Sequence, residues 1–290
     1  MEEYVLFTDC TADLPAELAE EWGIEMLPME VKIGQDEYLH YADAREIGFA
    51  EFYKRLREGE MATTSQITMA TFRKYFTPFL QKGKDILYIV FSSGLSGTYG
   101  AAVLAAEELM KEFPGRKIRC VDSLAASVGE GLLVYTAAQK KREGMSLAEL
   151  AAWTEESRNH LCHWFTVDDL HFLKRGGRVS AVSATFGSML KIKPVLHVDD
   201  EGHLIPMKKA HGRKKALKEL VEMMRETVEA PEGQTIFIGH GDCAEDAELV
   251  ARLVRADFPV KEVRTTYIGP VIGSHSGPGT VALFFFGSHK

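Results

Sequence analysis

The chain has 290 residues, of which 46% are hydrophobic and 26% charged, the balance of a folded globular protein and not of a disordered chain. Its formal net charge of −8 argues against a nucleic-acid-binding protein, because neutralising phosphates requires a basic surface. No apolar run reaches the roughly 18 residues of a membrane span, and the start Met1-Glu2-Glu3 lacks the basic region of a signal peptide. We therefore expect a cytoplasmic protein.

The first half of the chain alternates short β-rich runs with longer helical patterns, which predicts βαβ units around a largely parallel sheet. Strands are expected over residues 4–8, 86–90 and 118–121, each followed by a polar turn. Ligands of such sheets bind outside the carboxyl ends of the strands, so we expect these turns to line one site.

Two helix starts have the spacing of a capping box, namely Asp43 with Glu46 and Ser146 with Glu149. Residues 125–143 have the pattern of a long buried helix.

Near residues 160–164 the pattern changes and β-rich segments become more numerous. Further strands are expected over residues 161–167, 192–198, 235–238, 263–267 and 281–286. Helices over 213–229 and 244–257 would cover one face of their sheet. The predicted fold class is α/β with two domains, an N-terminal parallel-sheet α/β domain of residues 1–160 and a C-terminal α+β layered domain of residues 161–290.

A loop rich in serine and glycine, residues 91–99, joins a predicted strand to a predicted helix. The unpaired N–H groups and the dipole of a helix N-terminus suit a carboxylate or phosphate, which makes Ser93 a candidate ligand residue. The alternative is that these residues only cap the helix.

Two other polar segments are candidates for the same site. Thr64 and Ser65 belong to a cluster over residues 63–66, which would by itself also serve as a cap for a helix beginning near Met69. His275 lies in a loop whose dense glycines and prolines restrict the backbone, residues 268–279. A histidine in so rigid a frame indicates a ligand contact more than a structural role.

Arg175 and Arg178 flank a double-glycine turn and would supply positive charge to an anion. The alternative is an ion pair with Asp168 or Asp169.

Neither a metal site nor a disulfide is expected. His160, Cys162 and His163 lack a fourth ligand at motif spacing. The four cysteines have no CxxC spacing and are expected to be reduced thiols: Cys10, Cys120, Cys162 and Cys243.

A basic cluster near the middle of the second half is either a solvated helix start or a docking surface for an acidic partner. Its members are Lys208, Lys209, His211, Arg213, Lys214 and Lys215.

Taken together, these segments resemble the DegV family of fatty-acid-binding proteins, and the resemblance runs from end to end. It rests on residues 8–14, 64–66, 92–99, 122–123, 166–170 with 176–178, 192–194 and 269–279. Two positions depart from the usual pattern, because Cys10 stands where serine is common and Ile67 where proline often follows the glutamine.

The resemblance implies that the protein buries one long-chain fatty acid, such as palmitate, stearate or oleate, and uses no cofactor. It also implies that the protein is not an enzyme but presents the carboxylate to a separate fatty-acid kinase, which makes an acyl phosphate for phospholipid synthesis, with transient membrane-surface contact. By motif, Thr64, Ser93 and His275 would bind the carboxylate. Ser65, Arg175 and Arg178 are further candidates that would assist in binding the carboxylate.

Apolar residues near the motifs could line such a slot, although most are expected to be ordinary core. They are Phe72, Phe76, Phe79, Phe91, Phe165, Phe172, Phe186, Met189, Leu190 and Phe284 to Phe286.

Two enzymatic alternatives compete with the binding function. In an acyl hydrolase, Ser93 would be the nucleophile and His275 its base, with Asp9, Asp122 or Asp242 orienting the histidine. However, Ser93 is not in a GxSxG elbow. A phosphoryl-transfer enzyme would need a P-loop lysine or a GxGxxG fingerprint, and the sequence has neither.

Overall fold

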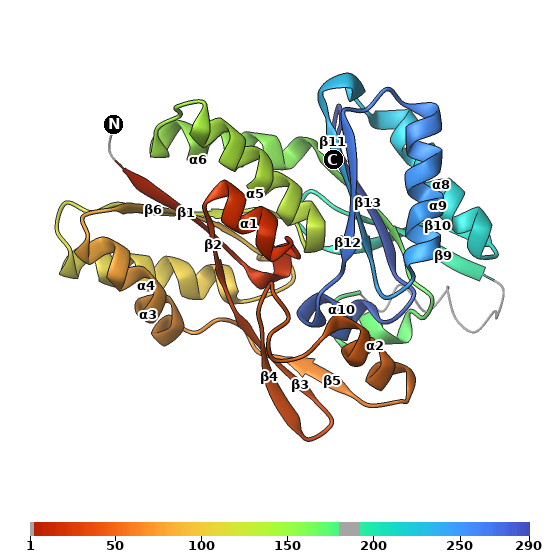
Figure 1. Cartoon of the computed structure of the whole chain (residues 1–290), viewed down its shortest axis with the longest axis horizontal. Coiled ribbons are helices and arrows are strands. Elements are labelled where there is room, and N and C mark those ends of the chain that lie inside the picture. Colours follow the sequence, from red (N-terminus) through yellow and green to blue (C-terminus); the bar gives the residue numbers. More distant parts are fainter. Residues whose placement is uncertain (1–2, 180–191) are drawn as a thin grey trace.

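A fully parallel four-stranded sheet forms the core of the first half of the chain (Figure 1). The computed structural model describes residues 3–179 and 192–290. The strand order is β2 (Ile24–Leu27), β1 (Tyr4–Asp9), β6 (Asp85–Val90) and β7 (Ile118–Asp122). β1 and β6 are buried along their whole length, as expected for parallel strands with helices on both faces.

Helices cover both faces of this parallel sheet. α3 (Met69–Gln81) and α4 (Thr98–Glu112) pack on one face, against Phe7 and Tyr88. The opposite face, which carries Leu6 and Leu87, is covered by three helices. These are α1 (Ala16–Trp22), α5 (Ser127–Arg142) and α6 (Leu147–Ser157).

A small antiparallel sheet and α2 (Phe49–Arg57) lie at the carboxyl end of the parallel strands (Figure 1). Its strand order is β4 (Asp36–His40), β3 (Met29–Ile33) and β5 (Ala62–Thr64). Alternate residues of β3 are buried, so one face of the small sheet joins the core and the other meets solvent.

A six-stranded mixed sheet forms the second half. Its order is β10 (Leu204–His211), β9 (Ile192–Val198), β8 (Leu161–Thr166), β13 (Val281–Phe286), β11 (Thr235–His240) and β12 (Glu262–Tyr267). α8 (Arg213–Thr227) and α9 (Ala244–Asp257) cover one face, where Cys162 and Trp164 of β8 point. Leu161 and Phe165 point to the opposite face, because side chains alternate along a strand.

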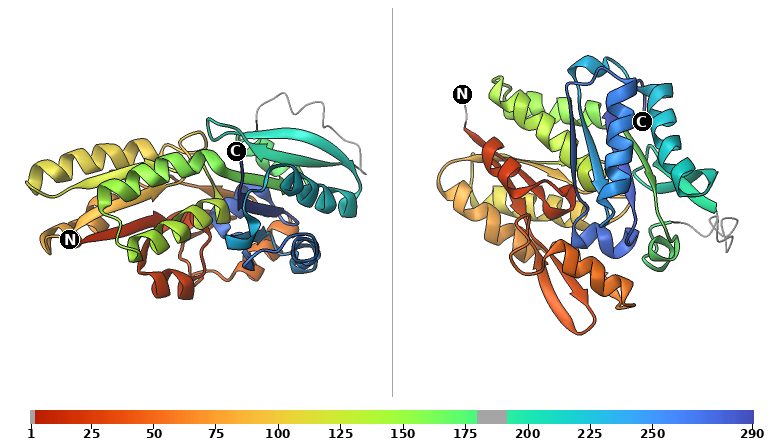
Figure 2. Two further views of the ribbon diagram at one scale, coloured as in Figure 1. Left: turned by 90° about the horizontal axis from the view of Figure 1, so that it is seen from above. Right: turned by 45° about the vertical axis from the view of Figure 1, so that its right-hand side comes forward.

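α5 lies between the two larger sheets (Figures 1 and 2), and eleven of its 16 residues are buried. Two glycines permit this close packing. A Cβ on Gly129 would lie 2.6 Å from Cδ1 of Phe284 on the second sheet, and one on Gly131 would lie 2.4 Å from the Ala12 carbonyl oxygen beside the first. The helix therefore joins both halves into one core.

The turn between β9 and β10 touches the serine- and glycine-rich loop of the first half. The Ser92 hydroxyl donates to the Gly202 carbonyl oxygen at 2.9 Å. A Cβ on Gly94 would lie 2.8 Å from the Glu201 carbonyl oxygen. The two backbones come this close because neither glycine has a side chain.

Most predicted elements are confirmed. The strands predicted over residues 4–8, 86–90, 118–121 and after residue 160 are present, as are the buried helix α5 and both helices α8 and α9. The Ser146 capping box is complete, with Glu149 bonding back to the Ser146 amide. The boundary at residues 160 and 161, which falls between the two larger sheets, stays a prediction.

The helix start predicted at Asp43 is wrong. Asp43 instead accepts hydrogen bonds from Arg45, and Glu46 accepts one from the Leu39 amide. Since both carboxylates are used in this way, α2 begins only after Gly48.

The short strands β2 to β5 were also missed, as was the eight-residue strand β10. The basic cluster is consequently not only a helix start: Lys208, Lys209 and His211 lie on β10, and Arg213 opens α8. In the two described ranges, no helix combines the length and apolarity needed to cross a bilayer.

Gly202→Ala tests the contact between the β9–β10 turn and the first half. Gly202 has φ +82°, and a Cβ there would lie 2.1 Å from Ser92 Oγ and 3.2 Å from Leu124 Cα. Gly83→Ala is the matched control, because Gly83 has φ +76° with nothing within 4 Å of its Cβ position. We expect urea unfolding to show a loss of about 1–2 kcal/mol for the control and a clearly larger loss for Gly202→Ala. Equal losses would contradict the contact.

Candidate functional site

A cavity of about 290 Å³ lies between the two halves of the molecule. Its walls are mostly apolar and come from Phe91, Leu95, Ala126, Phe165, Leu173, Val198, Leu204, Val271, Ile272, Ala282 and Phe284, with Met29 and Ile268. Its polar lining residues are Thr64, Gln66, Ser96, Gly97, Ser127, His163, Arg178, His275, Ser276 and Thr280. A cavity lined mainly by apolar side chains, with some polar groups among them, is the usual form of a ligand site.

Thr64 and His275 meet at the cavity although 211 residues separate them in the sequence. Thr64 ends β5, and His275 lies on α10 (Pro270–Ser276). The Thr64 hydroxyl and His275 Nε2 are 2.8 Å apart. If Nε2 carries the proton and donates to Thr64 Oγ1, the Thr64 hydroxyl is free to donate to a bound anion.

The charge around His275 favours an anion. Burial, and then the positive charges of Arg178 and Arg175, lower the pKa of His275 to about 4, so the imidazole is neutral at neutral pH. Arg178 lines the cavity and donates from Nε to the Leu95 carbonyl oxygen at 3.2 Å. A neutral donor beside a guanidinium suits a carboxylate well.

The start of α4 adds further donors. Ser96 and Gly97 line the cavity immediately before the first helical residue, Thr98. The Ser96 hydroxyl accepts a hydrogen bond from the Thr98 amide at 3.2 Å. The first turn of a helix of this length leaves backbone N–H groups available to an anion.

The structure thus brings Thr64, His275 and Arg178 together at the cavity and leaves the other predicted residues outside it. Ser93 is exposed, and its amide donates to Asp122 Oδ1 at 3.1 Å. Ser65 and Arg175 are also exposed. The carboxylate role of Ser93 stays a prediction, whereas Ser96 of the same loop lines the cavity.

Neither arginine forms the ion pair considered from the sequence. Asp168 instead pairs with Lys193 at 2.8 Å and Arg213 at 3.6 Å. Arg175 lies over the ring of Phe172, 4.9 Å from its centroid. Arg178 donates to the carbonyl oxygens of Leu95 and Gly176, so within the described residues its charge at the cavity is not paired with Asp168 or Asp169.

The hydrolase alternative has no geometric support. His275 Nε2 is bonded to Thr64, Ser93 lies at the surface, and Asp122 is bonded to the Ser93 amide. A histidine whose pKa is about 4 is also a weak general base at neutral pH.

Three buried carboxyl groups, Asp9, Asp13 and Glu130, form an acidic layer that is linked to the cavity wall through Ser127. Thr11 Oγ1 is within hydrogen-bonding distance of both Asp9 and Glu130, and Thr8 donates to Glu130 at 2.9 Å. One hydroxyl proton cannot serve two carboxylates, so one of the acids itself carries a proton and donates. Burial raises the pKa of Asp9, and that of Glu130 well above its usual value.

Asp13 connects this acidic layer to the cavity. Its two oxygens accept hydrogen bonds from the Ser127 hydroxyl at 2.6 Å and the Gly269 amide at 2.9 Å. Ser127 lines the cavity, and Gly269 precedes α10. Asp13 therefore positions one wall of the cavity and the helix that carries His275. Burial raises the pKa of Asp13 to about 8.

The predicted apolar residues divide into two groups. Phe91, Phe165 and Phe284 line the cavity, while Phe72 and Phe76 pack in the core with Phe79 beside them. Phe172 packs beside Gly277, Phe285 faces α8 and α9, and Phe286 lies at the edge of the core. Phe186, Met189 and Leu190 lie outside the described residues.

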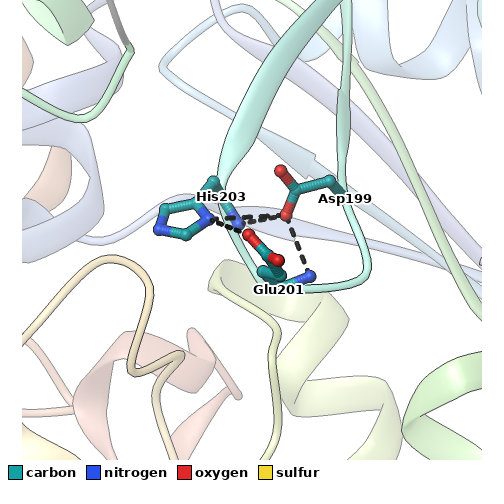
Figure 3. Close-up of side chains that lie close together, drawn as sticks. All are labelled: Asp199, Glu201 and His203. Atoms are coloured by element: carbon teal, nitrogen blue, oxygen red, sulfur yellow. Dashed lines mark hydrogen bonds and ion pairs between the residues drawn. The ribbon is translucent and has the colours of Figure 1, made fainter.

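Among the described residues, one group of potential metal ligands lies close together: Asp199, Glu201 and His203 (Figure 3). Asp199 Oδ1 accepts the backbone N–H groups of Glu201 and His203, which closes the β9–β10 turn. The Asp199 carboxylate is therefore explained by the turn, whereas the Glu201 carboxylate is exposed and lies 3.7 Å from His203 Nδ1. All four cysteines are free thiols.

Comparison with known proteins gives a consistent result over the whole chain. The family described as "Uncharacterised protein, DegV family" matches residues 4–288. A DegV domain-containing protein of Clostridium perfringens is 47% identical over 290 residues, covering 100% of this chain and 99% of that protein.

Solved structures agree with this match. One described as "Fatty Acid Binding of a DegV family Protein from Thermus thermophilus" has a TM-score of 0.88 at 33% identity, covering 98% of this chain and 99% of its own. DegV from Bacillus subtilis, described as a fatty acid binding protein, has a TM-score of 0.85 at 28% identity, covering 99% and 100%.

Asp13→Asn should flatten the pH dependence of stability. The folded state holds the Asp13 proton up to a pKa of about 8, against 3.8 for an ordinary aspartate, so the free energy of unfolding falls as the pH rises through this window. Asparagine removes that contribution while keeping an acceptor for the Gly269 amide. The measurement is urea unfolding between pH 4 and pH 8.

Asp43→Asn serves as the control, because hydrogen bonds from Arg45 lower the pKa of Asp43 and it titrates below this window. Parallel curves for wild type and Asp13→Asn would show that Asp13 keeps no proton in the folded state.

Proposed function

The chain belongs to the DegV family, and on that premise we propose that it binds one long-chain fatty acid in the cavity, with the carboxylate at Thr64 and His275. The observation that carries the proposal is the pairing of a neutral histidine and a threonine hydroxyl, beside Arg178, at a cavity with apolar walls. The Thermus thermophilus relative, described as binding fatty acid, supports it.

The energetics fit such a ligand. Burying an acyl chain gains about 0.8 kcal/mol per methylene, so around fourteen methylenes offer on the order of 11 kcal/mol before the costs of association. A carboxylate buried without partners would cancel much of this gain. Thr64, His275, Ser96 and the amides that open α4 are the groups that would prevent that loss.

We further propose that the protein presents the carboxylate to a separate fatty-acid kinase in the cytoplasm, as part of phospholipid synthesis, and contacts the membrane surface transiently. Lys174 and Arg175 are exposed next to Arg178 and form a basic rim suited to an acidic partner. The cluster at residues 208–215 is less suitable, because Lys208 pairs with Glu219 and Arg213 with Asp246.

Native mass spectrometry of the purified protein tests the binding proposal. We expect one fatty acid per chain, such as palmitate, stearate or oleate. Thr64→Val and His275→Ala should each weaken retention by tenfold or more, since a hydrogen bond to a charged group contributes about 1.5–3 kcal/mol. Far-UV circular dichroism and thermal unfolding would establish that both variants fold.

Thr63→Val is the matched control for Thr64→Val, because Thr63 is the exposed neighbouring threonine on β5, and we expect it to retain the ligand. Ser93→Ala tests the remaining prediction for Ser93, which expects weaker retention. An empty wild-type protein that also refuses added palmitate and oleate would refute the proposal. Full retention in both cavity variants would instead move the carboxylate away from Thr64 and His275.

Lys174→Glu should slow acyl-phosphate formation by a fatty-acid kinase while leaving retention of the fatty acid unchanged, because Lys174 is exposed on the basic rim and is not among the charges that act on His275. The reason is that charge reversal at the basic rim repels an acidic docking surface without touching the cavity lining. The effect should shrink with added salt. Lys214→Glu makes the same change of charge at an exposed site on α8 and is expected to have little effect. Equal rates for both variants would argue against docking at the rim.

A further inference from the structure

His163 is a polar side chain at an apolar position of the cavity wall. It lies in the middle of β8, and its neighbours on the same face, Leu161 and Phe165, belong to the apolar core. It is only 1% exposed and lines the cavity. Across the whole described chain, neither ring nitrogen has a hydrogen-bond partner. A buried polar group left in this state costs free energy, so the imidazole requires an explanation.

The described residues around His163 give its ring no hydrogen-bond partner, although Lys290 and His197 are close enough to act on it through their charge. The ring of Phe284, which lies opposite it in the register of β8 and β13, meets the imidazole edge-on with centroids 5.5 Å apart. On the other side lies Gly129 of α5, where a Cβ would be 3.5 Å from Nε2. The imidazole is therefore enclosed by protein on these sides and faces the cavity.

His163 also lies far from the carboxylate end of the cavity. Thr280 lies at the carboxylate end. Its hydroxyl donates to the carbonyl oxygens of Ser276 and Gly277, which directly follow His275 in the chain. Phe284, the register partner of His163, follows four residues later on β13, which corresponds to about 13 Å of strand. A fatty acid with its carboxylate at Thr64 and His275 would pass His163 in the middle or distal part of its chain.

We propose that His163 forms a second polar subsite in the cavity, which binds the hydroxyl group of a long-chain fatty acid hydroxylated away from its carboxyl end. This assignment rests on the proposed function and names the class of fatty acid that the same cavity would take. A neutral imidazole has one donor and one acceptor, and a hydroxyl group matches both. Burial lowers the pKa of His163 well below its usual value, in keeping with a neutral ring.

Other occupants fit less well. A saturated chain would leave both ring nitrogens unpaired. A trapped water needs two to four polar partners, whereas Phe165, Ala282 and Phe284 are the cavity-lining residues on this part of β8 and β13. A hydroxyl carried on an acyl chain is held in place by the chain itself and needs only the imidazole.

The test is competition between stearate and a series of hydroxystearates with the hydroxyl at successive mid-chain carbons, measured by native mass spectrometry on the full chain. We expect the wild-type protein to prefer one positional isomer over its neighbours and to bind it at least as tightly as stearate. His163→Phe should reduce the preference for that isomer about tenfold without weakening stearate. His163→Asn, which keeps a donor and an acceptor, should retain part of the preference.

His197→Phe is the matched control. His197 is a buried histidine on the adjacent strand β9, stacked on Trp164 with centroids 4.3 Å apart, and it is not among the cavity-lining residues. Its Nδ1 lies 2.9 Å from the His163 carbonyl oxygen, so this variant shows what disturbing the His163 backbone does while the His163 imidazole is kept. If His163→Phe does not fold, the order in which the wild type and His163→Asn prefer the hydroxystearate isomers tests the second subsite instead.

Two results would overturn the assignment, and they differ in what else they refute. Normal stearate binding with no positional preference among hydroxystearates, or a preference unchanged in His163→Phe, would refute the second subsite alone. If neither stearate nor any hydroxystearate binds, the proposed fatty-acid function is refuted as well.

Discussion

The packing of α5 between the two larger sheets is the constraint on which the rest of the structure depends. A helix buried on nearly all sides must approach both sheets closely, and Gly129 and Gly131 allow this because a Cβ at either would collide with Phe284 or Ala12. The same helix begins at the cavity, where Ala126 and Ser127 form part of the wall. α5 therefore belongs both to the core and to the cavity wall, and a shift of this helix would alter both.

The acidic layer linked to the cavity wall shows how a site for an anion can coexist with buried carboxyl groups. Asp9, Asp13 and Glu130 would repel a bound carboxylate if all were ionised, but burial raises the pKa of each and keeps protons on the layer. The positive charge near His275 comes from Arg178 and Arg175 on the other side. Asp13 then acts as a structural connection, because it holds the Ser127 hydroxyl and the Gly269 amide at once.

Segments far apart in the sequence converge here for a topological reason. The loops after β1, β6 and β7 leave the same edge of a parallel sheet, and the turn between β9 and β10 closes over that edge through Gly202 and Ser92. Sequence patterns locate such loops well, since strands and glycine-rich turns are local signals. They do not show which hydroxyl of a loop turns inward, and so they favoured Ser93 where Ser96 lines the cavity.

The parallel sheet, the buried helix α5, the family and the polar loops that carry Thr64 and His275 could all be predicted from the sequence, because each depends on periodicity or on motifs of neighbouring residues. β2 to β5 were missed, because they have only three to five residues each and leave little periodicity to detect. β10 was also missed, because its register shifts between Pro206 and Lys208 and its basic residues favoured a helix start. Three features appear only in the folded chain: the pairing of Thr64 with His275, the proton carried by either Asp9 or Glu130 around Thr11, and the unpartnered imidazole of His163 in the cavity wall. These features depend on distances between residues remote in the sequence and on the exclusion of water, and no local pattern records either.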